Sequence, residues 1–123
     1  MIILLLFSLL VLWFFVRWKN SRSQPSHTLG AANGKLADCP DSPNCVSTQA
    51  SDSQHRIAPI PFTQSADEVL ARLEATIMAM PRSRIVNSNA NYLHVEFSSL
   101  LLGFIDDVEV YMLNGIATGL FFQ

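Results

Sequence analysis

The chain has 123 residues, half of them apolar, and a formal net charge of −2 at neutral pH. This length allows one small domain besides any targeting segment. The low charge and the lack of a Lys/Arg cluster argue against nucleic acid as a partner, because binding it requires a concentrated basic surface.

Residues 1–16 are apolar except for one serine, and the run ends in a tryptophan between two basic residues, Arg17 and Lys19. A helix of this length rises about 24–27 Å, slightly less than the ~30 Å hydrocarbon core of a bilayer. Interfacial tryptophans and long basic side chains that reach the head groups compensate for the difference. No basic residue precedes the run and no small-residue cleavage site follows it. Residues 1–18 are therefore predicted to be an uncleaved membrane anchor rather than a signal peptide or a buried helix.

Residues 19–28 are polar and contain proline and serine, which predicts a tether. Residues 29–56 lack apolar periodicity and contain several glycines and prolines, which predicts a long loop. A structureless loop of this length is unusual unless it is pinned, and both cysteines of the chain lie within it.

Cys39 and Cys45 can reach each other if the two prolines between them turn the chain back. A disulfide here would close a small local loop. Free thiols are one alternative, and a zinc site that adds His27 and His55 is another. The cysteine spacing is wider than zinc sites usually have. We expect the disulfide, with no metal and no cofactor.

The next segment, residues 57–62, is β-prone but contains two prolines, so it can only be an edge strand or an extended arm. Ser65 and Glu68 form the pattern of a capping box at a helix start. Apolar residues at three- to four-residue spacing then predict an amphipathic helix over residues 65–80, which Pro81 ends.

Short β-prone segments separated by turn residues make up the rest of the chain. Strands are predicted at residues 84–87, 91–97, 105–112 and 116–122, with turns at residues 88–90 and 114–115. Residues 98–104 fit either a helical turn or a kinked strand. The natural assembly of residues 29–123 is an α+β domain, a small and mainly antiparallel sheet packed on one amphipathic helix.

Alternation along two predicted strands gives a candidate site. If these strands are neighbours, one sheet face carries His94, Glu96, Asp107 and Glu109. Such a group could hold a divalent cation or act as an acid/base pair. The alternative, which we favour, is a solvated polar face whose charges are offset by Arg82 and Arg84.

A series of separate motifs runs through residues 29–110. It comprises Leu29-Gly30, Asn33-Gly34, Leu36-Ala37, the loop from Cys39 to Ser47, and residues 55–62, 82–86, 92–97 and 104–109. In this order the motifs resemble those of the domain of unknown function 1499 family of bacteria and plastids. The resemblance implies a membrane-associated or exported α+β domain without an established activity.

After Val110 the resemblance ends. Members of that family continue into a further strand and a turn rich in arginine and serine, which this chain lacks. We expect a C-terminally shortened or altered member, with a domain that is incomplete relative to the family. The strand at residues 116–122 is so short that it gains little burial, which would make the domain marginally stable. It would also leave an apolar edge open for self-association, which would make the domain prone to aggregation.

Two arguments about the side of the membrane oppose each other. Basic residues directly after the apolar run, Arg17, Lys19 and Arg22, favour a cytoplasmic domain. A disulfide requires an oxidising compartment, and the family resemblance includes exported members. We expect a single-pass protein of the bacterial inner membrane with its domain on the extracytoplasmic side.

The sequence has no nucleophile elbow, no S-x-x-K motif and no phosphate-binding glycine loop. We therefore expect a membrane-anchored, non-enzymatic module that binds a protein partner or small ligand through residues 29–56. The lipid bilayer would be a further partner, through residues 1–18. The alternative is a small metal-assisted enzyme that uses the His/Glu/Asp face.

Overall fold

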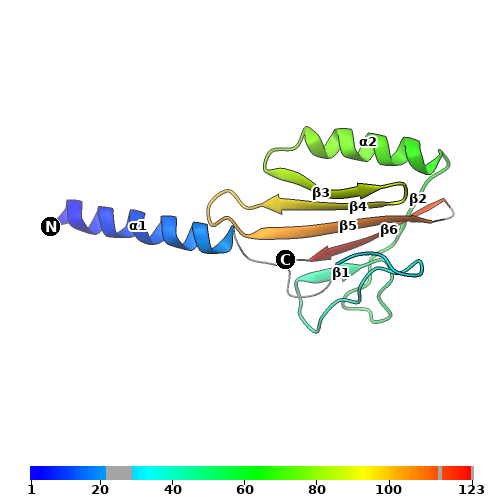
Figure 1. The fold of residues 1–123 in the computed structure, drawn as a ribbon. Helices are drawn as coiled ribbons and strands as arrows, with labels where there is room; N and C mark the ends of the chain where they lie inside the picture. Colours follow the sequence, from blue (N-terminus) through cyan, green and yellow to red (C-terminus); the bar gives the residue numbers. More distant parts are fainter. Residues whose placement is uncertain (22–28, 114, 123) are drawn as a thin grey trace.

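The protein consists of a projecting N-terminal helix and a domain with one sheet and one further helix (Figure 1). The computed structural model describes residues 1–21, 29–113 and 115–122. In this part of the chain the predicted α+β fold class is confirmed. Most of the predicted tether lies outside the described residues.

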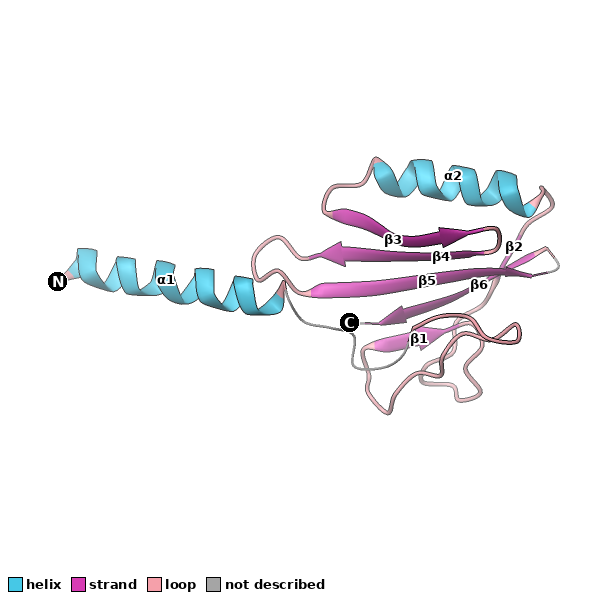
Figure 2. Ribbon diagram, viewed as in Figure 1, coloured by secondary structure: helices cyan, strands magenta, loops and turns pink. Residues whose placement is uncertain are grey.

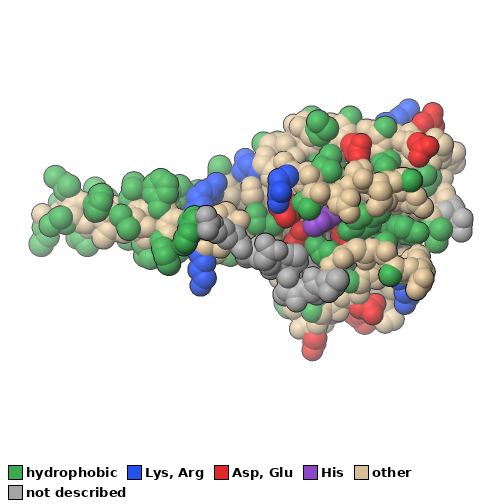
Figure 3. Space-filling model, in the orientation of Figure 1, with side chains coloured by type: hydrophobic (Ala, Val, Ile, Leu, Met, Phe, Trp, Pro, Cys, Tyr) green, Lys and Arg blue, Asp and Glu red, His purple; other side chains and the backbone are tan. Residues whose placement is uncertain are grey.

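Helix α1, Ile2–Asn20, has no buried residue. Figure 3 shows hydrophobic side chains along it and Lys or Arg side chains at the end next to the domain. Among the described residues it is the one helix long and apolar enough to cross a membrane, as membrane anchors and signal sequences are. It extends two residues beyond the predicted anchor.

The six strands of the described residues form one antiparallel sheet with the order β1-β6-β5-β4-β3, and β2 also pairs with β6 (Figure 2). Their bounds are β1 Cys45–Ser47, β2 Ile60–Pro61, β3 Ser83–Asn89, β4 Tyr92–Ser98, β5 Ile105–Leu113 and β6 Ile116–Phe122. The predicted strands are confirmed within two residues, and the two-proline segment forms the short β2. β1 lies in the segment predicted to be loop throughout.

Strand β6 is not an edge. It pairs along its whole length with β5, and its other side pairs with β1 and β2. The prediction of an open apolar edge is therefore wrong for this strand, whereas the marginal stability expected of the domain stays a prediction.

Helix α2, Ala66–Met78, begins as the sequence predicts. The Ser65 hydroxyl accepts a hydrogen bond from the Glu68 amide, and the Glu68 carboxylate accepts one from the Ser65 amide, each at 3.3 Å. The helix packs its apolar stripe on one face of the sheet (Figure 2). The buried core of this layer comprises Leu70, Ile77, Leu93, Val95 and Met112.

Residues 99–104 form a loop, the β4–β5 loop, rather than a helical turn or a continued strand. The Ser99 amide donates to the Phe104 carbonyl, and the Phe104 amide donates to the Ser99 hydroxyl, both at 2.9 Å. These two bonds close the loop at its base.

Candidate functional site

The face of the sheet opposite α2 carries the predicted polar residues. β4 and β5 pair in a register that places His94 opposite Glu109 and Glu96 opposite Asp107. Directly paired residues project to the same side of a sheet. The register therefore gathers all four side chains on one face, as the alternation predicted.

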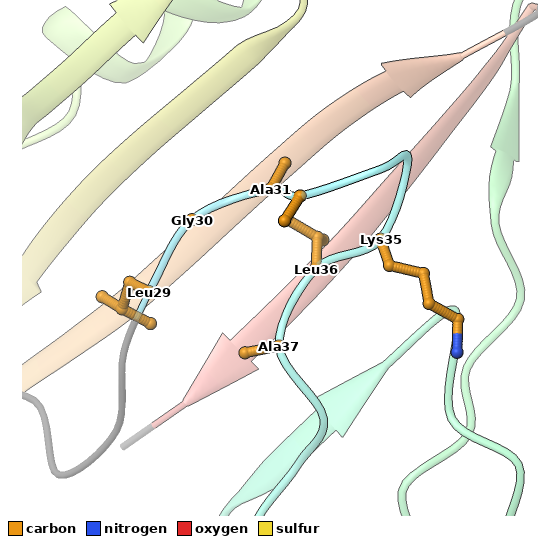
Figure 4. A pocket seen from close by; sticks show the side chains of 7 residues that line it. Leu29, Gly30, Ala31, Lys35, Leu36 and Ala37 are labelled. Atoms are coloured by element: carbon orange, nitrogen blue, oxygen red, sulfur yellow. The ribbon is translucent and has the colours of Figure 1, made fainter.

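This face is buried, so the prediction of a solvated polar face is wrong. Glu109 is completely buried, and Asp107 and His94 are only 4% and 8% exposed. The segment at residues 29–37, the covering segment, crosses β5 and β6 on this face in a tight turn (Figure 4), and its Gly30 amide donates to Glu109. One expected charge pair does form at the margin, where Arg84 Nη2 lies 2.6 Å from Glu96 Oε2.

Glu109 is the centre of the buried polar network. Its Oε1 accepts a hydrogen bond from the Gly30 amide at 2.6 Å and one from the Tyr92 hydroxyl at 2.5 Å. Burial, together with the Glu109 carboxylate, raises the pKa of Tyr92 above its ordinary value. Tyr92 is thus a neutral hydroxyl donor at physiological pH. The covering segment is tied to the sheet through one carboxylate.

The second buried pair of this face joins His94 and Asp107. His94 Nε2 lies 2.6 Å from Asp107 Oδ1. Across the residues that the structure describes, no three His, Cys, Asp or Glu side chains are grouped as ligands of a metal ion. The four candidates therefore share a face without converging on one point.

The roles of Gly30 and Tyr92 were not predicted from the sequence. Tyr92 and the covering segment form a second small core, with Leu36 and Cys45 as its other buried members. The available signal was a tyrosine on the same strand face as the carboxylates, because a buried Tyr hydroxyl needs a polar partner. The Gly30 donor is a backbone amide, which every residue except proline has, so the sequence gives no sign of this hydrogen bond.

The predicted disulfide between Cys39 and Cys45 is present, with a Cα–Cα distance of 5.7 Å. The zinc alternative is therefore wrong for these cysteines, since both sulfur atoms are bonded to each other. His27, its fourth candidate ligand, lies outside the described residues. Cys45 also opens β1, so the disulfide fixes the chain directly before it enters the sheet.

His55 makes a different set of contacts. Its Nε2 lies 3.0 Å from the Ser42 carbonyl oxygen, and its Nδ1 lies 2.8 Å from Asp52 Oδ1. Two acceptors favour the doubly protonated ring. The Ser42 carbonyl, followed by the Asp52 carboxylate, accordingly raises the pKa of His55. The pKa of Asp52 is lowered, mainly by the hydrogen bond from the His55 amide.

The opposite face of the sheet contains an apolar cavity of about 380 Å³ next to α2. Its lining comes from α2, β2, β4, β5 and β6 and includes Ile60, Val69, Leu73, Thr76, Val108 and Val110. Thr76 is the one described lining residue with a polar side-chain oxygen, and its hydroxyl donates to the Arg72 carbonyl at 2.8 Å. The cavity thus offers a ligand no free hydrogen-bonding side chain.

The sequence predicts an amphipathic helix packed on the sheet, and the cavity beside it was not predicted. A helix is about 10 Å wide and strands lie about 4.8 Å apart, so one helix covers roughly two strands. A sheet with five strands side by side leaves apolar positions of β5 and β6 beyond its reach. The signal for the cavity was that the sequence predicts more strands than a single helix can cover.

The His55–Asp52 pair gives a pH prediction. Because the folded-state pKa of His55 is raised, its stabilising contribution is complete below its ordinary value of about 6.5. That contribution is lost as the pH rises through the raised value. The Asp52 contribution is complete above about pH 4 and is lost as the pH falls through its lowered pKa. Asp52→Asn should lower the pKa of His55, as measured by NMR titration of its ring.

Asp67→Asn, on α2, is the control and should leave the titration of His55 unchanged. A wild-type pKa of His55 at or below about 6.5 would contradict the assigned pair.

A second prediction concerns Glu109. Glu109→Ala leaves the Gly30 amide without its acceptor, and an unsatisfied buried group costs about 1–3 kcal/mol. Hydrogen exchange of the Gly30 amide should therefore accelerate by roughly 5- to 150-fold. Tyr92→Phe is the matched control, since it removes the other donor and keeps the acceptor of Gly30. Equally slow exchange in Glu109→Ala and in the wild type would contradict this anchoring role.

The chain matches a known protein family. The family model described as "Protein of unknown function (DUF1499)" matches residues 35–117, more than half of the chain. No curated protein and no solved structure matches. The match continues past Val110 into β6, so the expected end of the similarity at that residue is wrong. The chain belongs to this family of proteins of unknown function.

Proposed function

We propose that the protein is a membrane-anchored, non-enzymatic module that binds an apolar chain, such as the acyl chain of a lipid, in the cavity beside α2. The observation that carries this proposal is the cavity itself. Its volume of about 380 Å³ lies within the ~300–1,000 Å³ of typical small-molecule pockets.

The chemistry of the lining supports an apolar occupant. The Thr76 hydroxyl is already bonded to backbone, so the cavity can offer only dispersion contacts and exclusion of water. Two of the lining side chains, Ile60 and Met80, are 69% and 45% exposed. An incoming chain would thus meet apolar surface before it reaches the interior.

Helix α1 indicates where such an acyl chain would come from. If it spans the bilayer as proposed, the domain stays next to a reservoir of acyl chains. The disulfide favours an oxidising compartment, and we place the domain on the extracytoplasmic side of the bacterial inner membrane.

The loop at residues 29–56, expected from the sequence to be the binding element, receives a supporting role in this proposal. It is fastened by the disulfide and by the Glu109–Gly30 hydrogen bond. The hollow of about 390 Å³ beside it is lined by residues of a single turn, from Leu29 to Ala37 (Figure 4). The cavity beside α2 instead draws its lining from five elements.

A metal-assisted enzyme is the second candidate, because the buried His94–Asp107 pair at 2.6 Å is the geometry of an oriented acid/base residue. Metal analysis of the purified protein separates the two candidates. We expect no stoichiometric metal, and one equivalent of zinc, manganese or iron would contradict the binding module.

Photocrosslinking tests the binding site. The full chain, reconstituted in lipid nanodiscs, is irradiated with a diazirine-labelled fatty acid, and the modified peptides are mapped by mass spectrometry. We expect adducts on α2 and β5, from residues that line the cavity. Thr76→Phe places a larger side chain in the lining, so it should narrow the cavity and reduce these adducts several-fold. The hydroxyl that it removes is bonded only to a backbone carbonyl of α2.

Ala75→Phe is the matched control, since Ala75 is an exposed neighbour on α2 and not part of the lining. It should leave the adducts unchanged. Adducts confined to α1, or an equal loss in both variants, would contradict binding in the cavity.

A further inference from the structure

The β4–β5 loop presents a cluster of large apolar side chains to the solvent. Leu100, Leu101 and Leu102 are 63%, 70% and 40% exposed, and Phe104 is 45% exposed. A contiguous apolar patch of this kind usually marks a surface that meets a partner or a membrane.

The backbone of this loop is hydrogen-bonded to α1. Three side chains of the helix donate to three consecutive loop carbonyls: Trp13 Nε1 to Leu101 at 2.9 Å, Arg17 Nη1 to Leu100 at 2.6 Å and Asn20 Nδ2 to Leu102 at 2.9 Å. The leucine cluster is thereby held beside the C-terminal half of α1, as Figure 1 shows for the two segments.

Gly103 permits this close approach. A Cβ atom at this position would lie 3.2 Å from Arg17 Cγ and 3.3 Å from the Arg17 carbonyl oxygen, and φ is +70°. Both the space and the backbone conformation favour glycine. The contact between loop and helix is therefore built into the local geometry of the chain.

These hydrogen bonds prepare the loop for a lipid environment. Within hydrocarbon an unsatisfied backbone carbonyl is costly, so backbone polar groups must find partners inside the protein. The carbonyls of Leu100, Leu101 and Leu102 have such partners, while their side chains remain free to contact lipid.

The position of the contact along α1 agrees with a lipid environment. The segment from Trp13 to Asn20 covers the last two turns of α1, where tryptophan and basic residues mark the boundary between hydrocarbon and head groups. The apolar part of α1 is slightly short for the hydrocarbon core. Leucines beside these turns add apolar surface at the depth where the helix itself becomes polar.

We propose that the β4–β5 loop is a second membrane contact, which inserts Leu100, Leu101, Leu102 and Phe104 into the lipid beside α1. The partner is the bilayer surface, and the contact fixes the orientation of the sheet domain on it. This inference rests on the part of the proposed function that makes α1 a membrane anchor.

Spin-label accessibility tests the insertion. Full-length variants Leu101→Cys, Ala90→Cys and Leu9→Cys carry a nitroxide label in phosphatidylcholine/phosphatidylglycerol vesicles, after peptide mapping has shown that Cys39–Cys45 is intact. Ala90 is exposed in the turn at the opposite end of β4, and Leu9 lies midway along α1. The label at Leu101 should be accessible to oxygen and at least several-fold protected from a water-soluble nickel complex, as at Leu9. The label at Ala90 should show the reverse.

Each other outcome overturns the insertion in a distinguishable way. A protected Leu9 label with a nickel-accessible Leu101 label would leave α1 an anchor and place the loop in water. A Leu101 label protected from both reagents would indicate a protein–protein contact. A nickel-accessible Leu9 label would overturn the anchor and, with it, this inference. Phe104→Cys provides a second position in the loop should Leu101→Cys fail to fold.

Discussion

The buried carboxylate of Glu109 is the interaction on which the rest of the domain depends. It lies on the central strand β5 and binds the first described residues of the covering segment through the Gly30 amide. Without this hydrogen bond the covering segment would lose its anchor on a face where Asp107 and His94 are also buried. Groups of this kind are costly to bury unless they are hydrogen-bonded. Glu109 makes both of its hydrogen bonds through Oε1, and among the described residues its buried Oε2 has no hydrogen-bond partner. The cover and the network beneath it therefore require each other.

The residues that share a face of each strand could be predicted because alternation is a local property of the sequence. Leu93, Val95 and Phe97 against Tyr92, His94 and Glu96 define two faces whatever the rest of the fold does. The capping box at Ser65 is local in the same sense. Burial of the polar face could not be predicted, because it depends on the path of a segment without periodicity. β1 was missed for the same reason, since three residues are too few to show a pattern.

The two faces of the sheet are covered by unequal means. One face receives a single helix, which is narrower than the sheet and leaves an apolar cavity over β5. The other receives a segment with little regular structure, held by a disulfide and a carboxylate. Regular elements pack by repeating side-chain patterns, whereas an irregular cover needs individual fixed points. The chemically distinctive residues of this chain accordingly concentrate on the irregular side, where they hold structure together.

Cys45 links the disulfide to β1, a strand at the edge of the sheet. This residue is one half of the disulfide and also the first residue of β1, which pairs with β6. A strand of three residues has little pairing energy of its own, so its attachment depends on the constraint directly before it. In a reducing environment β1 would separate more readily and uncover the hydrogen-bonding groups of β6, which could then recruit a strand from another molecule. The disulfide thus helps to keep this border of the sheet protected.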